Sequence, residues 1–142
     1  MTATARDLLA TKNSAVVYTC SADSSLDEAS QRMRDWRVRS LVVVRDGAVE
    51  GILTERDVVR EVVSEGIDPA RVRVRDVMEP EVPTVWLDAD VRAVEATLRA
   101  RRVRYVPVVA ERGLVGVISV SDLARFRATR TSGAERSGAA PC

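Results

Sequence analysis

One heptapeptide pattern, Gly51-Ile52-Leu53-Thr54-Glu55-Arg56-Asp57, returns 65 positions later as Gly116-Val117-Ile118-Ser119-Val120-Ser121-Asp122. Both copies read as glycine, two aliphatic residues, a hydroxyl residue, two variable positions and a carboxylate. The match extends over residues 16–61 and 81–126 at the same offset. Because two copies of one supersecondary unit usually pack together, the duplication predicts two equivalent sites around a pseudo-twofold axis.

The residues around each copy predict the same order of elements twice. After the helix-capping runs Asp23-Ser24-Ser25 and Asp88-Ala89-Asp90, apolar residues recur at three- and four-residue spacing, which predicts an amphipathic helix. The β-branched segments 40–44 and 105–109 follow, and each continues through a turn into the glycine-containing segment, which predicts a hairpin of buried strands. The sequence therefore predicts an α+β protein, of α/β sandwich type, made of two β-α-β-β-α repeats.

Breaks in the apolar pattern divide the chain into segments. Gly66-Ile67-Asp68-Pro69 interrupts the helix that follows the first hairpin. We expect a first repeat with its N-terminal segment at 1–66, a linker at 67–75 and a second repeat at 76–128. The tail at 129–142 has no apolar periodicity, which predicts disorder.

Composition argues against several classes of function. The 22 basic and 21 acidic side chains give a net charge of +1, so no global field favours nucleic acid or an anionic membrane. The absence of histidine removes the commonest general base and the commonest zinc ligand. Cys20 and Cys142 form neither a metal-ligand spacing nor a disulfide scaffold. No apolar run approaches the ~20 residues that a spanning helix requires, so we expect no membrane association. With the histidine and cysteine counts, this favours a cytoplasmic protein without a metal.

The spacing of hydroxyl and carboxylate in each copy has two interpretations. It matches a helix capping box, which adds ~1 kcal/mol of stability and needs no further function. Capping does not explain Gly51 and Gly116, because a buried strand loses packing at glycine unless something approaches its backbone. A bound ligand is one such thing, and a carboxylate beside a hydroxyl at a helix start also suits a ribose diol.

Arginines near each motif could complete a nucleotide site. Arg39 and Arg104 hold equivalent positions at the start of the first hairpin strand, where a guanidinium could bind phosphate. Val38 and Val103 precede them and could cover one face of an adenine. The alternative is ordinary solvated surface, since nearly all the positive charge of the chain is arginine and Lys12 is the only lysine.

Together these features resemble a tandem pair of CBS domains, the small regulatory repeat named for cystathionine β-synthase. The segments Arg6-Asp7-Leu8-Leu9 and Arg75-Asp76-Val77-Met78, one before each repeat, fit the same family. The resemblance covers roughly residues 5–127. It implies clefts between the repeats that bind adenosine-containing ligands such as AMP, ADP, ATP or S-adenosylmethionine.

The resemblance assigns the same four positions of each copy to the ligand, and the strand argument adds the motif glycine of each copy. These are the ribose-binding carboxylates Asp57 and Asp122, the hydroxyls Thr54 and Ser119, the adenine-contacting Val38 and Val103, the phosphate-contacting Arg39 and Arg104, and the motif glycines Gly51 and Gly116. The chain departs from the family at Val42, where the second copy has the usual proline as Pro107. The first copy also has about four extra residues between Leu9 and Thr19.

Three classes of function follow from these features. The first is a non-catalytic regulatory protein that binds an adenine nucleotide as ligand, needs no cofactor, forms a homodimer and acts on an unidentified protein partner. The second is a homodimeric interaction module without nucleotide, in which arginines contact an acidic protein or nucleic acid: Arg99, Arg101, Arg102 and Arg104. The third, an enzyme, lacks histidine, a cysteine dyad and a GxxxxGK phosphate loop. The homodimer is expected because Val58, Val59, Val62 and Val63 form an apolar face too broad for one core.

Overall fold

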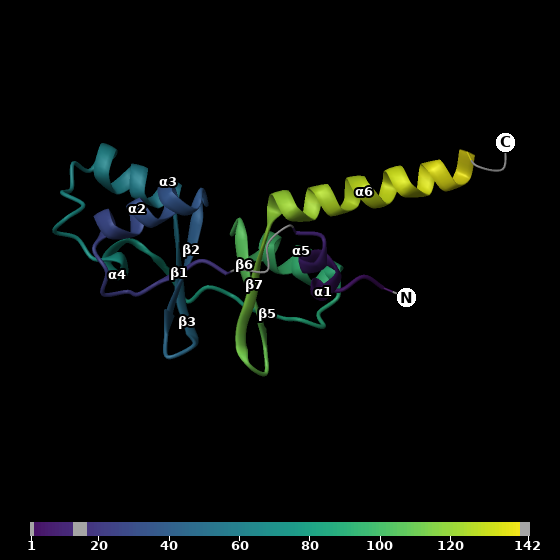
Figure 1. Ribbon diagram of the computed structural model, residues 1–142, viewed down its shortest axis with the longest axis horizontal. Helices are drawn as coiled ribbons and strands as arrows, with labels where there is room; N and C mark the ends of the chain where they lie inside the picture. Colours follow the sequence, from purple (N-terminus) through teal and green to yellow (C-terminus); the bar gives the residue numbers. More distant parts are fainter. Residues whose placement is uncertain (1, 13–16, 140–142) are drawn as a thin grey trace. The chain divides into compact units, whose positions relative to one another are not determined.

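The computed structural model describes residues 2–12 and 17–139 and divides the chain into two compact units (Figure 1). One unit is Val16–Val82, and the other joins Met1–Ala15 to Pro83–Cys142. Each unit holds one small sheet with helices against it, so the predicted α+β class is confirmed.

The unit Val16–Val82 is built on a four-stranded sheet of order β1-β2-β3-β4. Its strands are β1 (Thr19–Cys20), β2 (Ser40–Arg45), β3 (Ala48–Thr54) and β4 (Glu79–Pro80). Its helices are α2 (Leu26–Trp36), α3 (Glu55–Val59), which continues as the π-helical turn η1 (Arg60–Ser64), and α4 (Val74–Val77). Strand β1 runs parallel to β2, whereas β2 with β3 and β3 with β4 are antiparallel.

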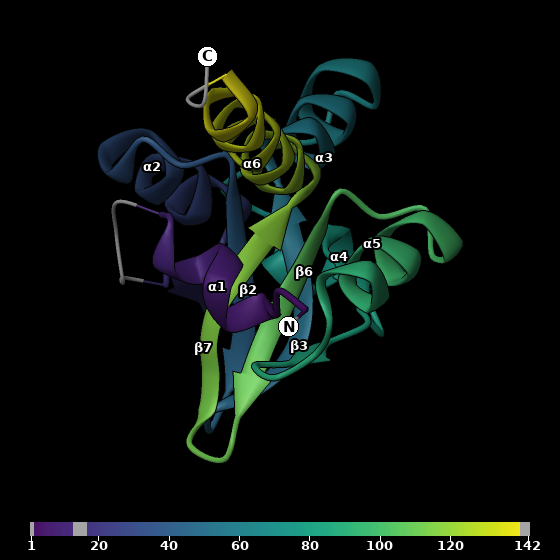
Figure 2. The same cartoon turned by 90° about the vertical axis from the view of Figure 1, so that its right-hand side faces the viewer.

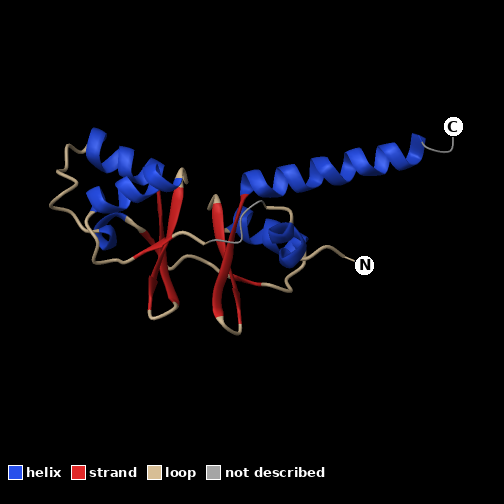
Figure 3. Ribbon diagram, viewed as in Figure 1, coloured by secondary structure: helices blue, strands red, loops and turns tan. Residues whose placement is uncertain are grey.

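The other unit repeats this plan with a three-stranded sheet of order β5-β6-β7 (Figure 3). Its strands are β5 (Val85–Trp86), β6 (Tyr105–Ala110) and β7 (Gly113–Ser119). Its helices are α1 (Ala5–Ala10), α5 (Val91–Ala100) and α6 (Val120–Ala139). Both units thus contain the predicted β-α-β-β-α order.

The two hairpins share one register. Ser40 pairs with Thr54 in the first hairpin, and Tyr105 pairs with Ser119 in the second. Each hairpin shifts register at the equivalent step, after Val43 and after Val108. The duplication in the sequence is therefore a duplication of backbone geometry as well.

Each core forms where the apolar spacing predicts it. Helix α2 buries Leu26, Ala29 and Met33, and α5 buries Val91, Val94 and Leu98. Trp36 continues the apolar series of α2 but is 41% exposed. Helix α2 ends at Trp36, one turn beyond Met33, the last buried residue of the helix. The centroid of the Trp36 ring lies 5.1 Å from that of Tyr18.

The helix that precedes each repeat packs in the unit of the other repeat. In α1, the Ala5 N–H donates to Ala89 O at 2.8 Å, and α1 contacts β7, α5 and α6 (Figure 2). In α4, the Val74 N–H donates to Ser24 O at 2.9 Å. The expected boundaries 1–66, 67–75 and 76–128 therefore do not delimit the compact units, because backbone pairing joins each leading helix to the strand-to-helix loop of the other repeat.

The tail expected to be disordered from Thr129 is helical as far as Ala139. Residues 129–139 include threonine, serine and glycine, which form helices weakly, but the proline of this tail, Pro141, lies beyond the helix. Among the helices of the described ranges, none combines the length and apolar character needed to cross a bilayer.

Candidate functional site

Hydroxyl and carboxylate meet at the strand-to-helix junction in both units. The Thr54 N–H donates to Asp57 Oδ2 at 3.0 Å, and the Asp57 N–H donates to Thr54 Oγ1 at 3.2 Å. The same pair of bonds joins Ser119 to Asp122 at 2.8 and 3.0 Å. The capping interpretation is confirmed, and one oxygen of each carboxylate remains for another partner.

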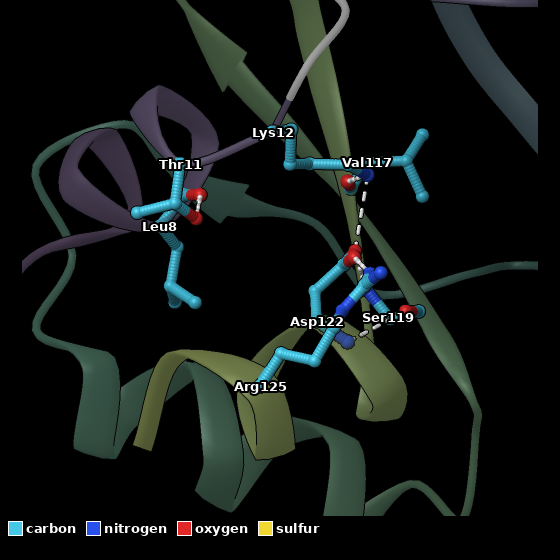
Figure 4. A network of polar contacts seen from close by, with 7 residues as sticks. All are labelled: Leu8, Thr11, Lys12, Val117, Ser119, Asp122 and Arg125. Carbon is cyan, nitrogen blue, oxygen red and sulfur yellow. Dashed lines mark hydrogen bonds and ion pairs between the residues drawn. The ribbon is translucent and has the colours of Figure 1, made fainter. Parts of the chain in front are cut away.

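The two carboxylates differ in their remaining partners. Asp57 Oδ1 accepts from Arg60 Nη2 at 3.3 Å, and the Asp57 side chain is 15% exposed. Asp122 Oδ1 accepts from Arg125 Nη2, while Asp122 Oδ2 also accepts from Lys12 Nζ at 3.0 Å (Figure 4). The Asp122 side chain is only 6% exposed. The second carboxylate is therefore bound by two cations and nearly closed to solvent.

Electrostatics keep Asp122 ionised. Burial raises the pKa of its carboxyl, but hydrogen bonds from the Ser119 N–H and from Lys12, with the Lys12 charge, outweigh that effect. The net result is a pKa of Asp122 below its usual range.

Sequence reasoning did not assign Lys12 to this site. Lys12 follows α1, and 110 positions separate it from Asp122. It reaches Asp122 only because α1 packs on β7 and α6. The one signal in the sequence was that Lys12 is the only lysine of the chain.

Arg39 and Arg104 lie beside the two junctions through their backbones. Arg39 O accepts from the N–H of Glu55 at 2.9 Å, and Arg104 O accepts from the N–H of Val120 at 3.0 Å. Both arginine side chains are exposed, so their guanidinium groups are available to a ligand.

The valines before these arginines are partly committed to packing. Val38 packs against the core of its unit, as Val103 does in the other unit. Val38 and Arg39 also line a groove between α2 and α3, together with Ser30, Met33, Arg34, Arg37, Glu55, Val58 and Val59. Thr54 and Asp57 are absent from the lining of this groove, so it does not unite all the predicted groups.

The motif glycines have a different explanation from the one expected. A Cβ on Gly51 would lie 2.6 Å from Glu79 O and 2.9 Å from Met78 Sδ. A Cβ on Gly116 would lie 2.7 Å from a methyl carbon of Leu9. The close approach inferred from the sequence is real. The leading segment of the other repeat makes it in each unit, so a ligand is not needed to explain Gly51 and Gly116.

Comparison with known proteins identifies the family. A family model described as CBS domain matches residues 4–64 and 74–129. The chain belongs to the CBS domain family. Its structure resembles that of a protein with CBS domains from Burkholderia ambifaria, with a TM-score of 0.79 and 28% identity over 87% of this chain and 93% of that one.

Two further matches define what the likeness covers. The mitochondrial CBS domain-containing protein CBSX3 of Arabidopsis thaliana is 30% identical over 111 residues, 75% of this chain and 54% of that protein. The chain thus spans about half the length of this CBS relative. The CBS domain pair of protein MJ0100, solved with 5′-methylthioadenosine and S-adenosyl-L-methionine, has a TM-score of 0.78 at 22% identity and covers 92% of this chain and 99% of that one. At this identity the likeness establishes the shared fold alone.

Among the described residues, no three histidine, cysteine, aspartate or glutamate side chains cluster as a metal site. Cys20 is buried in its core, and burial raises the pKa of its thiol to about 11.

Proposed function

We propose that this chain is a non-catalytic regulatory protein that binds an adenosine-containing ligand at the strand-to-helix junctions of its CBS repeats. The observation that carries the proposal is the repeated junction, where a hydroxyl, a carboxylate and an arginine backbone meet at the first turn of a helix. The solved MJ0100 pair supports the ligand class, since that protein is in complex with two adenosyl compounds.

Each group of the first junction has a role that its chemistry suits. The Asp57 carboxylate accepts hydrogen bonds from the ribose 2′- and 3′-hydroxyls, because an ionised carboxylate is the strongest acceptor there. The Thr54 hydroxyl supports the same end of the sugar. Arg39 neutralises phosphate with a planar set of donors, while Val38 offers an apolar edge to the base.

Asp57→Asn tests the ribose assignment. Asparagine keeps one oxygen for the Thr54 N–H but replaces the other with a donor that competes with the diol. We expect calorimetry to show about tenfold or more loss of affinity for AMP, the size of one charge-assisted hydrogen bond. Asp68→Asn, at an exposed carboxylate paired with Arg71, is the matched control and should bind as the wild type does. Wild-type affinity in Asp57→Asn would refute the assignment.

Replacement of both Arg39 and Arg104 by alanine tests the phosphate assignment. We expect AMP to lose affinity while adenosine does not, because adenosine keeps the sugar and base but carries no anion. The preference for nucleotide over nucleoside should fall by about tenfold per occupied site. Arg45→Ala, at the far end of β2 and paired with Glu50, is the control. Equal losses for AMP and adenosine would make these arginines supports of the fold.

A homodimeric interaction module is the second candidate. Val59 and Val63 are 51% and 73% exposed and stand one turn apart on the helix that begins at Glu55. Apolar residues grouped in this way favour a second copy of the chain or another protein as cover. A dimer in light scattering that binds neither AMP nor S-adenosylmethionine would favour this candidate.

A further inference from the structure

The outer side of the second hairpin strand, β3 or β7, has different partners in the two units. In the unit Val16–Val82, Ile52 of β3 pairs with Glu79 of β4, the strand that follows α4. Ile52 corresponds to Val117 of β7 at the 65-residue offset. The Val117 carbonyl accepts instead from Lys12 Nζ at 2.7 Å. The backbone position that corresponds to Ile52 therefore has the Lys12 ammonium as a hydrogen-bond partner.

The same ammonium binds the candidate ribose carboxylate. Lys12 Nζ donates to Val117 O and to Asp122 Oδ2, so two of its three protons have fixed acceptors (Figure 4). The Lys12 side chain is 33% exposed, which places its stem along the protein surface. With Arg125 on the other oxygen, both oxygens of Asp122 already accept from cations.

Among the described residues of the first unit, no lysine from the leading segment is found in an ion pair with Asp57. When the leading segments are aligned through Leu9 and Met78, which contact Gly116 and Gly51, the counterpart of Lys12 is the carboxylate residue Glu81. Arg60 is the cation paired with Asp57, and it lies on the same helix rather than on a distant segment. The leading segment therefore places a cation at Asp122 and a carboxylate residue at the corresponding position of the first unit.

We propose that Lys12 is an intramolecular occupant of the second junction, so that the first junction binds an adenosine ligand more tightly than the second. This inference rests on the proposed function. A ribose diol at Asp122 has to replace the Lys12 hydrogen bond. The ion pair found for Asp57 among the described residues is with the exposed Arg60 of its own helix. Lys12 thereby sets which repeat responds at low ligand concentration, and ligand capture at the second repeat releases the residue that follows α1.

Calorimetry with AMP and with S-adenosylmethionine tests the proposal. We expect one ligand per chain for the wild type and two for Lys12→Met, with a gain of about tenfold or more at the second junction, since one charge-assisted hydrogen bond no longer competes. Lys12→Arg keeps a cation and should behave as the wild type does. Asp122→Asn in the Lys12→Met background should return the count to one. Two sites of equal affinity in the wild type, or weaker binding in Lys12→Met, would overturn the proposal while leaving the proposed function in place.

A measurement without ligand distinguishes failure of the Lys12 proposal from failure of the proposed function. Because Lys12 is the only lysine, acylation by an amine-reactive ester followed by peptide mapping reports on one side chain apart from the α-amino group. We expect Lys12 to react several-fold more slowly in the wild type than in Asp122→Asn, with circular dichroism to verify that both are folded. Equal rates would overturn the occupancy of Asp122 by Lys12. Unequal rates without any binding in the wild type or Lys12→Met would overturn the proposed function and, with it, the inference.

Discussion

Asp122→Ala is expected to lower the free energy of unfolding by about 2–3 kcal/mol, and Asp57→Ala by only about 1 kcal/mol. Both variants lose a capping box. Asp122→Ala also removes the buried acceptor of Lys12 and Arg125, whereas the ion pair found for Asp57 within the described ranges is with Arg60. The loss at Asp122 stays below the ~3–5 kcal/mol of a fully buried pair because Lys12 is partly solvated.

Urea unfolding of the two variants beside the wild type measures this difference. The sequence alone predicts equal costs, because the two motifs are equivalent in it. Equal destabilisation would therefore show that Lys12 adds nothing to the stability of the second unit. Lys12→Met provides the complementary measurement, since it removes the cation and keeps the capping box.

Gly51→Ala is expected to cost about 3 kcal/mol, near the upper end for overpacking, whereas Gly116→Ala costs about 1 kcal/mol. The new methyl group at Gly51 would press on the Glu79 carbonyl oxygen at 2.6 Å, which is held in the pairing of β3 with β4. At Gly116 the nearest atoms are the end of the Leu9 side chain, which a rotamer change can move.

Thermal unfolding of both glycine variants checks the order of the two effects. The two glycines hold the same place in the repeat, so each is the natural control for the other. A larger loss in Gly116→Ala would mean that α1 is fixed more rigidly than β4. Unchanged stability in both variants would contradict the packing explanation and would favour a bound ligand as the reason for the two glycines.

Much of the fold could be predicted because its determinants are local. The apolar spacing of α2 and α5, the two hairpins and the capping boxes each depend on residues within one repeat. Duplication strengthened these predictions, since a chance pattern seldom occurs twice at one offset. Trp36 and the tail after Thr129 were the weaker points, because there the local pattern meets the end of a helix or the end of the chain.

The sequence predicted the candidate residues of both junctions, but it did not predict that Asp57 and Asp122 have different partners. The sequence determined that each repeat carries a hydroxyl, a carboxylate and an arginine at a strand-to-helix junction. Only the tertiary structure decided which helix packs on which repeat, what approaches Gly51 and Gly116, and that Lys12 binds Asp122. The Lys12 contacts join residues 105 and 110 positions apart. Local sequence patterns do not predict these contacts, because the contacts arise from the packing of α1 and not from residue spacing along the chain.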